Sequence, residues 1–218
     1  MFRSDSALKE KNYLRLPNPP KEFVDLCVRA VEKYKDQPWK IIMSDYHFSS
    51  DVDDNDREKF KEIIPERIYN VSVNLITKAV LPLTHIDRGR KAALQMPIVA
   101  DPTVHKVYVL AKEKFFKKIK ADARNRGEFR KGNKPEVTKW ENERYPGMPM
   151  FHIFDENYFQ ISPVEPMIPY INDTSIPHGG IHYDGNHDQP INERWFISVS
   201  LAERISVAER EEIFKDWL

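Results

Sequence analysis

Between residues 67 and 201 the chain is a succession of short segments rich in β-branched and aromatic residues. The first, 68–76, has the sequence IYNVSVNLI and lacks the apolar period of a helix. Many short strands divided by turn-forming residues are typical of a sandwich, barrel or jelly roll. We therefore expect a mainly β core over about 67–201. Further segments of this kind, divided by clusters of Pro, Gly, Asn and Asp, lie at 92–100, 106–110, 150–154, 167–171 and 194–201.

Ahead of this core, apolar residues recur with helical spacing after Pro19 and Pro20, a pair that suits the first turn of a helix. Their spacing predicts an amphipathic helix that covers a core. Residues 44–62 are polar and acidic, and we expect a loop that runs into a short helix there. The N-terminal part, about 1–65, is thus expected to be helical. The apolar residues of the predicted helix are Phe23, Leu26, Cys27, Ala30, Val31 and Tyr34.

The end of the chain also has a helix signal. Ser206 and Glu209 have the spacing of a capping box, which predicts a short helix that ends near Trp217. The expected architecture is one domain over 1–218, mainly β with flanking helices.

Composition narrows the classes of function. The 34 basic and 34 acidic residues cancel, so net charge gives no reason to expect nucleic acid as a partner. The one cysteine, Cys27, excludes an internal disulfide and a cysteine-based metal cluster, which suits a reducing compartment. No apolar run resembles a signal peptide or approaches the ~18 residues of a membrane span. A soluble, cytoplasmic protein is expected.

The segment 112–144 departs from this balance. It holds twelve Lys and Arg against six Asp and Glu, a local net charge of +6. Its first part is expected to be a helix that ends at Gly127. The segment is either a solvated insertion between two strands, or a lid or docking surface for an acidic partner. Its positive charge also leaves a nucleic-acid partner as an alternative.

The pair His85 and Asp87 is the main candidate for chemistry. Side chains two apart on a strand project from the same face, so an imidazole and a carboxylate can meet one metal ion. Two histidines and one carboxylate suit Fe(II) and leave one side of the ion open. A site of this kind here needs a second histidine, which must come from another strand. His182 and Asp184 have the same spacing but lie among turn-forming residues, in a predicted loop.

Three segments resemble the 2-oxoglutarate/Fe(II) oxygenases, nearest to phage-type and bacterial members that resemble aspartyl/asparaginyl hydroxylases. THIDRGRKAALQMPI, at 84–98, is similar to their strand and turn with the His-x-Asp motif. PMIPYINDTSIPHGG, at 166–180, is similar to the strand with their distal histidine. NERWFISVSL, at 192–201, is similar to the following strand, which opens with the arginine that binds 2-oxoglutarate. The likeness covers about 71–201 and implies a double-stranded β-helix, a cupin-like jelly roll.

The resemblance implies roles for individual residues. His85, Asp87 and His178 would be the Fe(II) ligands, and Arg194 would bind the distal carboxylate of 2-oxoglutarate, with O2 as the other cosubstrate. Asp87 favours hydroxylation over halogenation, because related halogenases lack that carboxylate. Gln95, from the strand after the His-x-Asp motif, is expected to line the pocket. The implied function is an Fe(II)- and 2-oxoglutarate-dependent dioxygenase, a hydroxylase of an unidentified substrate.

Two alternatives stay open at this point. His178, His182 and His187, with Asp184 near, could form a zinc site without oxidative chemistry. The chain could also be a non-catalytic jelly roll with a binding or structural role, since a fold does not imply a function. If Arg194 does not bind 2-oxoglutarate, Arg90 and Arg204 are the next candidates.

Overall fold

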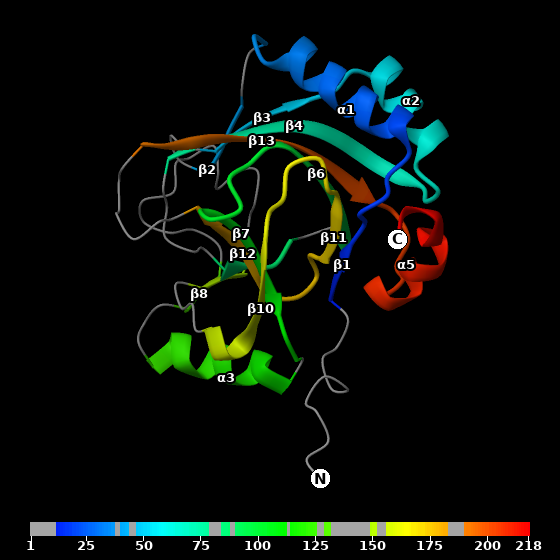
Figure 1. Cartoon of the computed structure of the whole chain (residues 1–218). Coiled ribbons are helices and arrows are strands. Elements are labelled where there is room, and N and C mark those ends of the chain that lie inside the picture. Colours follow the sequence, from blue (N-terminus) through cyan, green and yellow to red (C-terminus); the bar gives the residue numbers. More distant parts are fainter. Residues whose placement is uncertain are drawn as a thin grey trace.

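The computed structural model describes residues 12–37, 40–43, 47–78, 84–87, 90–112, 114–125, 129–131, 149–151, 156–182 and 190–218. Their strands form two antiparallel sheets (Figure 1). The larger sheet has the order β1 (Tyr13–Arg15), β11 (Tyr170–Asp173), β6 (Ala92–Val99), β13 (Pro190–Leu201), β4 (Ile68–Lys78), β3 (His47–Asp51) and β2 (Lys40–Met43). The smaller sheet has the order β10 (Phe159–Pro163), β7 (His105–Leu110), β12 (His178–His182), β5 (Thr84–His85), β9 (Pro149–Phe151) and β8 (Phe129–Lys131).

Helices flank the two sheets (Figure 1). None of the helices in the described part of the chain is long and apolar enough to cross a membrane. Their bounds are Lys21–Tyr34 for α1, Asp54–Ile63 for α2, Lys114–Asn125 for α3 and Val207–Ile213 for α5, with single 3-10 turns at Glu156–Tyr158 and Lys215–Trp217.

The two faces of the larger sheet differ in polarity, and β13 illustrates the difference. Ile197 lies opposite Val73 and Met96, and all three are fully buried. Its neighbour Ser198 lies opposite Ser72 and Gln95. Because successive side chains of a strand point to opposite faces, one face of the sheet is apolar and the other carries polar groups.

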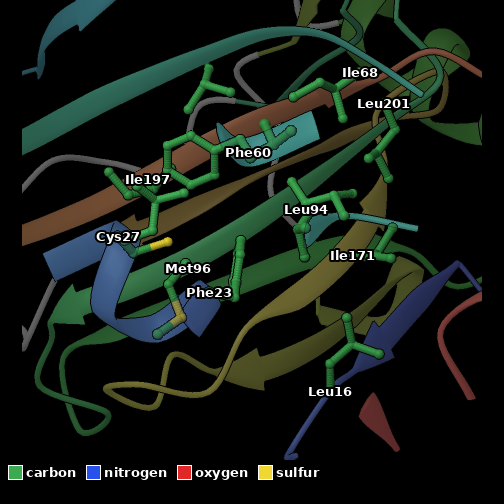
Figure 2. Close-up of a cluster of buried hydrophobic side chains, with 14 of the residues drawn as sticks. Leu16, Phe23, Cys27, Phe60, Ile68, Leu94, Met96, Ile171, Ile197 and Leu201 are labelled. Atoms are coloured by element: carbon green, nitrogen blue, oxygen red, sulfur yellow. The ribbon is translucent and has the colours of Figure 1, made fainter. Parts of the chain in front are cut away.

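Helices α1 and α2 cover the apolar face (Figure 1). The six apolar residues that predicted α1 are all buried, and they pack with the sheet in one hydrophobic cluster, of which Figure 2 labels Phe23 and Cys27. Within the cluster Phe23 lies 4.8 Å from Trp217, ring centre to ring centre, which joins α1 to the end of the chain. The main apolar core therefore lies outside the space between the sheets.

The C-terminal helix begins as the sequence predicted. Ser206 accepts a hydrogen bond from the Glu209 backbone, and the Glu209 side chain accepts one from the Ser206 backbone. This reciprocal capping box satisfies N–H groups that the first turn would otherwise leave unpaired.

The N-terminal region differs from the helical segment that was expected over 1–65. β1 pairs with β11, and β3 pairs with β4, so both strands belong to the larger sheet. Residues 47–51 form a strand where a loop was expected, because their backbone pairs with β4. A second difference concerns the segment 167–171, where a strand was expected. The strand β11 begins only at Tyr170, and Met167 has a φ of 62°, which is outside the extended region of the backbone.

A buried ion pair attaches α5 to the segment that precedes β4. The guanidinium of Arg210 donates to both carboxylate oxygens of Glu66, at 2.8 Å and 2.6 Å, and to the carbonyls of Ile205 and Glu203. The side chains of Arg210 and Glu66 are 0% and 1% exposed. A charge so buried depends on its partner, because removing one member leaves the other desolvated and unpaired.

We expect Glu66→Leu to lower the free energy of unfolding by about 3–5 kcal/mol, as for other broken buried pairs. The double variant Glu66→Leu/Arg210→Met should regain much of this loss, because no unpaired charge remains. Recovery should be incomplete, since two backbone carbonyls lose their donor. Urea denaturation of both variants and the wild type measures these differences. A double variant no more stable than Glu66→Leu would contradict this account of the pair.

Candidate metal and cosubstrate site

Two histidines face each other across neighbouring strands of the smaller sheet. β12 pairs with β5 so that His178 is directly opposite His85. Side chains directly opposite in an antiparallel pair project from the same face. The two imidazole rings are accordingly close, with 4.4 Å between their centres.

Asp87 completes a group of three potential metal ligands. Its Oδ1 lies 3.5 Å from Nε2 of His85, and its Oδ2 lies 3.8 Å from Nε2 of His178. Ligand atoms of all three residues lie within 4.8 Å of one another. Two atoms that each bind one ion at ~2.1 Å can be no more than about 4.2 Å apart, so both carboxylate distances suit a shared ion. The structure thus brings together the three residues that the sequence singled out.

The imidazole of His178 is oriented by a backbone contact. Its Nδ1 lies 2.9 Å from the carbonyl oxygen of Ile176. Because a carbonyl only accepts, Nδ1 carries the proton and the lone pair of Nε2 faces Asp87. A metal-ligating histidine commonly has this kind of support from its second ring nitrogen.

Burial and nearby charges keep His178 and Asp87 in the protonation states that bind a cation. Burial lowers the pKa of His178 to about 3, with a further lowering from the nearby His85, so its imidazole is neutral at pH 7. Burial alone would raise the pKa of Asp87, but the nearby Arg90 guanidinium, with smaller contributions from His178 and His85, holds that pKa well below its usual range. A neutral imidazole and a carboxylate anion are the protonation states that bind metals.

A buried arginine lies on the polar face of the larger sheet. Arg194, on β13, is 3% exposed. Its Nη2 donates to the hydroxyl of Tyr170 at 2.9 Å, and its guanidinium lies over the ring of Phe196 at 4.5 Å. Within the described part of the chain, its Nε has no hydrogen-bond partner and no carboxylate pairs with it. A buried guanidinium without a carboxylate is costly, so the site suits an anionic ligand.

Gln95 belongs to the same polar group. Its Oε1 accepts a hydrogen bond of 3.1 Å from the hydroxyl of Tyr170, so the three side chains form a chain from Arg194 through Tyr170 to Gln95. Tyr170 also stacks on Tyr13, with 5.4 Å between ring centres. Sequence reasoning missed Tyr170, because a tyrosine in an apolar strand gives no signal of its own.

The zinc alternative does not fit the strand geometry. His178 and His182 lie four residues apart in β12. At about 3.3 Å per residue their Cα atoms are ~13 Å apart, too far for two imidazoles of one strand to share an ion. His187 and Asp184 lie outside the described residues. His178 instead joins His85 and Asp87.

Comparison with known proteins gives a likeness of fold. No family model matches the chain, and no curated protein matches it. Among solved structures, the non-haem α-ketoglutarate-dependent epimerase SnoN from nogalamycin biosynthesis matches with a TM-score of 0.50 at 9% identity, over 87% of this chain and 78% of that one. The non-haem α-ketoglutarate-dependent carbocyclase SnoK, from the same biosynthesis, matches with a TM-score of 0.49 at 11% identity, over 86% and 78%. HygX from Streptomyces hygroscopicus, with nickel and 2-oxoglutarate bound, matches with a TM-score of 0.48 at 8% identity, over 89% and 84%.

At such low identity the likeness to SnoN concerns the fold. Together with the two antiparallel sheets and the flanking helices, it confirms the fold class predicted from the sequence, a mainly β protein with a double-stranded β-helix.

If the triad binds metal, His85→Ala should remove metal binding while leaving the metal-free fold nearly unchanged, because His85 belongs to none of the apolar clusters. We expect the metal-free unfolding temperature to fall by less than about 4 °C, or roughly 1 kcal/mol. Added Co(II) at ~100 times its dissociation constant should stabilise the wild type by about 2.7 kcal/mol and the variant far less. Thermal unfolding with and without Co(II) measures both effects. Equal stabilisation of the two proteins would place the metal elsewhere.

Proposed function

We propose that this chain is a non-haem Fe(II)- and 2-oxoglutarate-dependent dioxygenase. The observation that carries the proposal is the convergence of His85, Asp87 and His178 within 4.8 Å. On the other sheet lies the buried guanidinium of Arg194, without a carboxylate partner among the described residues. The first group supplies ligands for a metal ion, and the second supplies a cation for the carboxylate of a dicarboxylate cosubstrate.

The donor set fits Fe(II). Two imidazole nitrogens and one carboxylate oxygen are the ligand types of the non-haem Fe(II) oxygenases, and they leave open positions for small molecules. When bound, the iron with O2 would supply oxidative C–H chemistry, coupled to conversion of 2-oxoglutarate to succinate and CO2. The protein's part is to hold the ligands, orient the cosubstrate and exclude water.

Arg194 and Tyr170 would orient the cosubstrate. A guanidinium can bind both oxygens of a carboxylate, and such charge-assisted pairs are stronger than neutral hydrogen bonds. The hydroxyl of Tyr170 accepts from Nη2 at 2.9 Å and donates to Gln95, so it holds the guanidinium in position for that carboxylate. Arg90 is less suited to this role because its Nε is paired with Asp87 at 2.6 Å. Arg204, the other candidate, is exposed.

Hydroxylation is the reaction class that we favour. Asp87 supplies the carboxylate ligand that related halogenases lack. The sequence resemblance to aspartyl/asparaginyl hydroxylase-like members supports the same class. SnoN, which shares this fold, is an epimerase. Product analysis must therefore distinguish a hydroxylated product from the products of other oxidative reactions.

The wider setting belongs to the same proposal. We expect one oxygenase domain over 1–218, with a basic insertion at about 112–144 that begins with α3. A cytoplasmic location suits Cys27, a free thiol that is fully buried. The partners are 2-oxoglutarate, O2 and a substrate that a panel of candidates has to identify.

The direct test is a succinate assay with Fe(II), ascorbate and 2-oxoglutarate, with and without candidate substrates. The wild type should release succinate in proportion to the 2-oxoglutarate consumed, above a reaction without protein. His178→Ala should fall to that background, because the ion loses one of its three ligands. Absence of 2-oxoglutarate binding by the Fe(II)-loaded wild type under anaerobic conditions would refute the proposed function.

Arg194→Ala should raise the dissociation constant of 2-oxoglutarate by about 100-fold, roughly 3 kcal/mol, because the charge-assisted hydrogen bonds are lost. Arg194→Lys should recover only part of this affinity, since an ammonium group cannot make the two-pronged contact. Titration of the Co(II)-loaded proteins with 2-oxoglutarate measures the change.

Arg204→Ala is the matched control for this experiment. It removes the same side chain from an exposed position and should leave the affinity unchanged. Co(II) affinity should stay within about threefold in all variants. The metal-free Arg194→Ala protein should lose little stability, because no described carboxylate is left unpaired. Wild-type affinity for 2-oxoglutarate in Arg194→Ala would show that another group binds the cosubstrate.

A further inference from the structure

Arg90 connects the candidate metal ligands to the opposite sheet. Its Nε donates to Oδ2 of Asp87 at 2.6 Å. Its Nη1 lies 3.4 Å from the hydroxyl of Ser198 and 3.3 Å from that of Ser200, both on β13. β13 also carries Arg194. One side chain thus touches the carboxylate of the metal site and the strand of the cosubstrate site.

The backbone around Arg90 is fixed by a single buried residue. The carbonyl of Thr174 accepts from the backbone N–H of Asp87 at 2.9 Å, and the N–H of Thr174 donates to the carbonyl of Lys91 at 2.8 Å. The hydroxyl of Thr174 lies 3.3 Å from the carbonyl of Arg90. Thr174 is fully buried. The main chain at Asp87 and Arg90 is therefore held in place by Thr174, independently of the contact between their side chains.

The Arg90 contact divides the roles of the two carboxylate oxygens. Oδ2 of Asp87 receives the short charge-assisted bond from Arg90 and lies 3.8 Å from Nε2 of His178, whereas Oδ1 lies 3.5 Å from Nε2 of His85. Because the guanidinium engages a lone pair of Oδ2, Oδ1 is the oxygen with more lone-pair capacity for a metal. Hydrogen bonds of this kind fix the orientation of metal ligands, and losing them typically costs 10–100-fold in metal affinity or activity.

We infer that Arg90 is a positioning residue that holds Asp87 as a one-oxygen metal ligand and ties it to the strand that bears Arg194. The inference rests on the proposed function, since it assigns a role toward the metal of that site. It differs from a merely structural ion pair in what it predicts. A structural pair changes stability, whereas a positioning pair changes the affinity and the coordination of the bound metal.

The test compares Arg90→Met and Arg90→Lys with the control Lys91→Met. The control removes the same charge at the next residue, whose side chain is exposed, and keeps the backbone contact with Thr174. Co(II) is the probe, without 2-oxoglutarate, followed by calorimetry and by its visible absorption. Unfolding temperatures of the metal-free proteins are recorded alongside.

Arg90→Met should bind Co(II) about 10–100-fold more weakly than the wild type, and Lys91→Met should bind it equally well. The visible spectrum of Co(II) in Arg90→Met should also change, because both oxygens of Asp87 become free to coordinate. Arg90→Lys should lie between, since it keeps the charge and loses the fixed fork. If Arg90→Met does not fold, Arg90→Lys decides the question through the same two readouts.

Unchanged Co(II) affinity and spectrum in a folded Arg90 variant would overturn the inference, even with a lower unfolding temperature. In that case Co(II) binding by the wild type would leave the proposed function standing. A wild type that binds no Co(II) would overturn the proposed function together with this inference, so the two failures are distinguishable.

Discussion

The antiparallel pairing of β5 with β12 is the contact on which the site depends, because it sets His178 directly opposite His85. A slip of one residue in this register would turn one imidazole to the other face of the sheet. β5 is only two residues long, so the pairing needs help from outside the strand. The hydrogen bonds of Thr174 to Asp87 and Lys91 supply it, since they attach the segment after β5 to the segment before β12.

The polarity of the larger sheet explains how a small β protein can contain both a core and a polar site. Helices α1 and α2 cover its apolar face, so burial of the main core does not require the space between the sheets to be filled with apolar side chains (Figures 1 and 2). β13 serves both sides, with Ile197 and Val199 in the core and Arg194 and Ser198 on the polar face. Its alternation therefore sets both the position of the buried Arg194 and the packing of the helices.

The sequence predicted the parts that depend on local pattern. The helical stripe from Phe23 to Tyr34, the capping box at Ser206 and the alternation of β13 are all read from neighbouring residues. It did not predict β1 or β3, because these strands are stabilised by pairing with β11 and β4, which lie outside their own local sequence. The sequence likewise contains no signal for the contacts of Tyr170 and Thr174. For Arg90 it showed only an arginine, with no indication of the contact with Asp87. Their roles come from contacts between distant segments, and the type of residue alone does not reveal them.

The most direct test of the central claim is a crystal structure grown without oxygen in the presence of Fe(II) and 2-oxoglutarate, with anomalous diffraction to locate the iron. Our account predicts one iron at ~2.0–2.2 Å, the usual range for nitrogen and oxygen ligands, from Nε2 of His85, Nε2 of His178 and one oxygen of Asp87. The distal carboxylate of 2-oxoglutarate should then lie on Arg194. Iron bound elsewhere, or 2-oxoglutarate bound away from Arg194, would contradict the account.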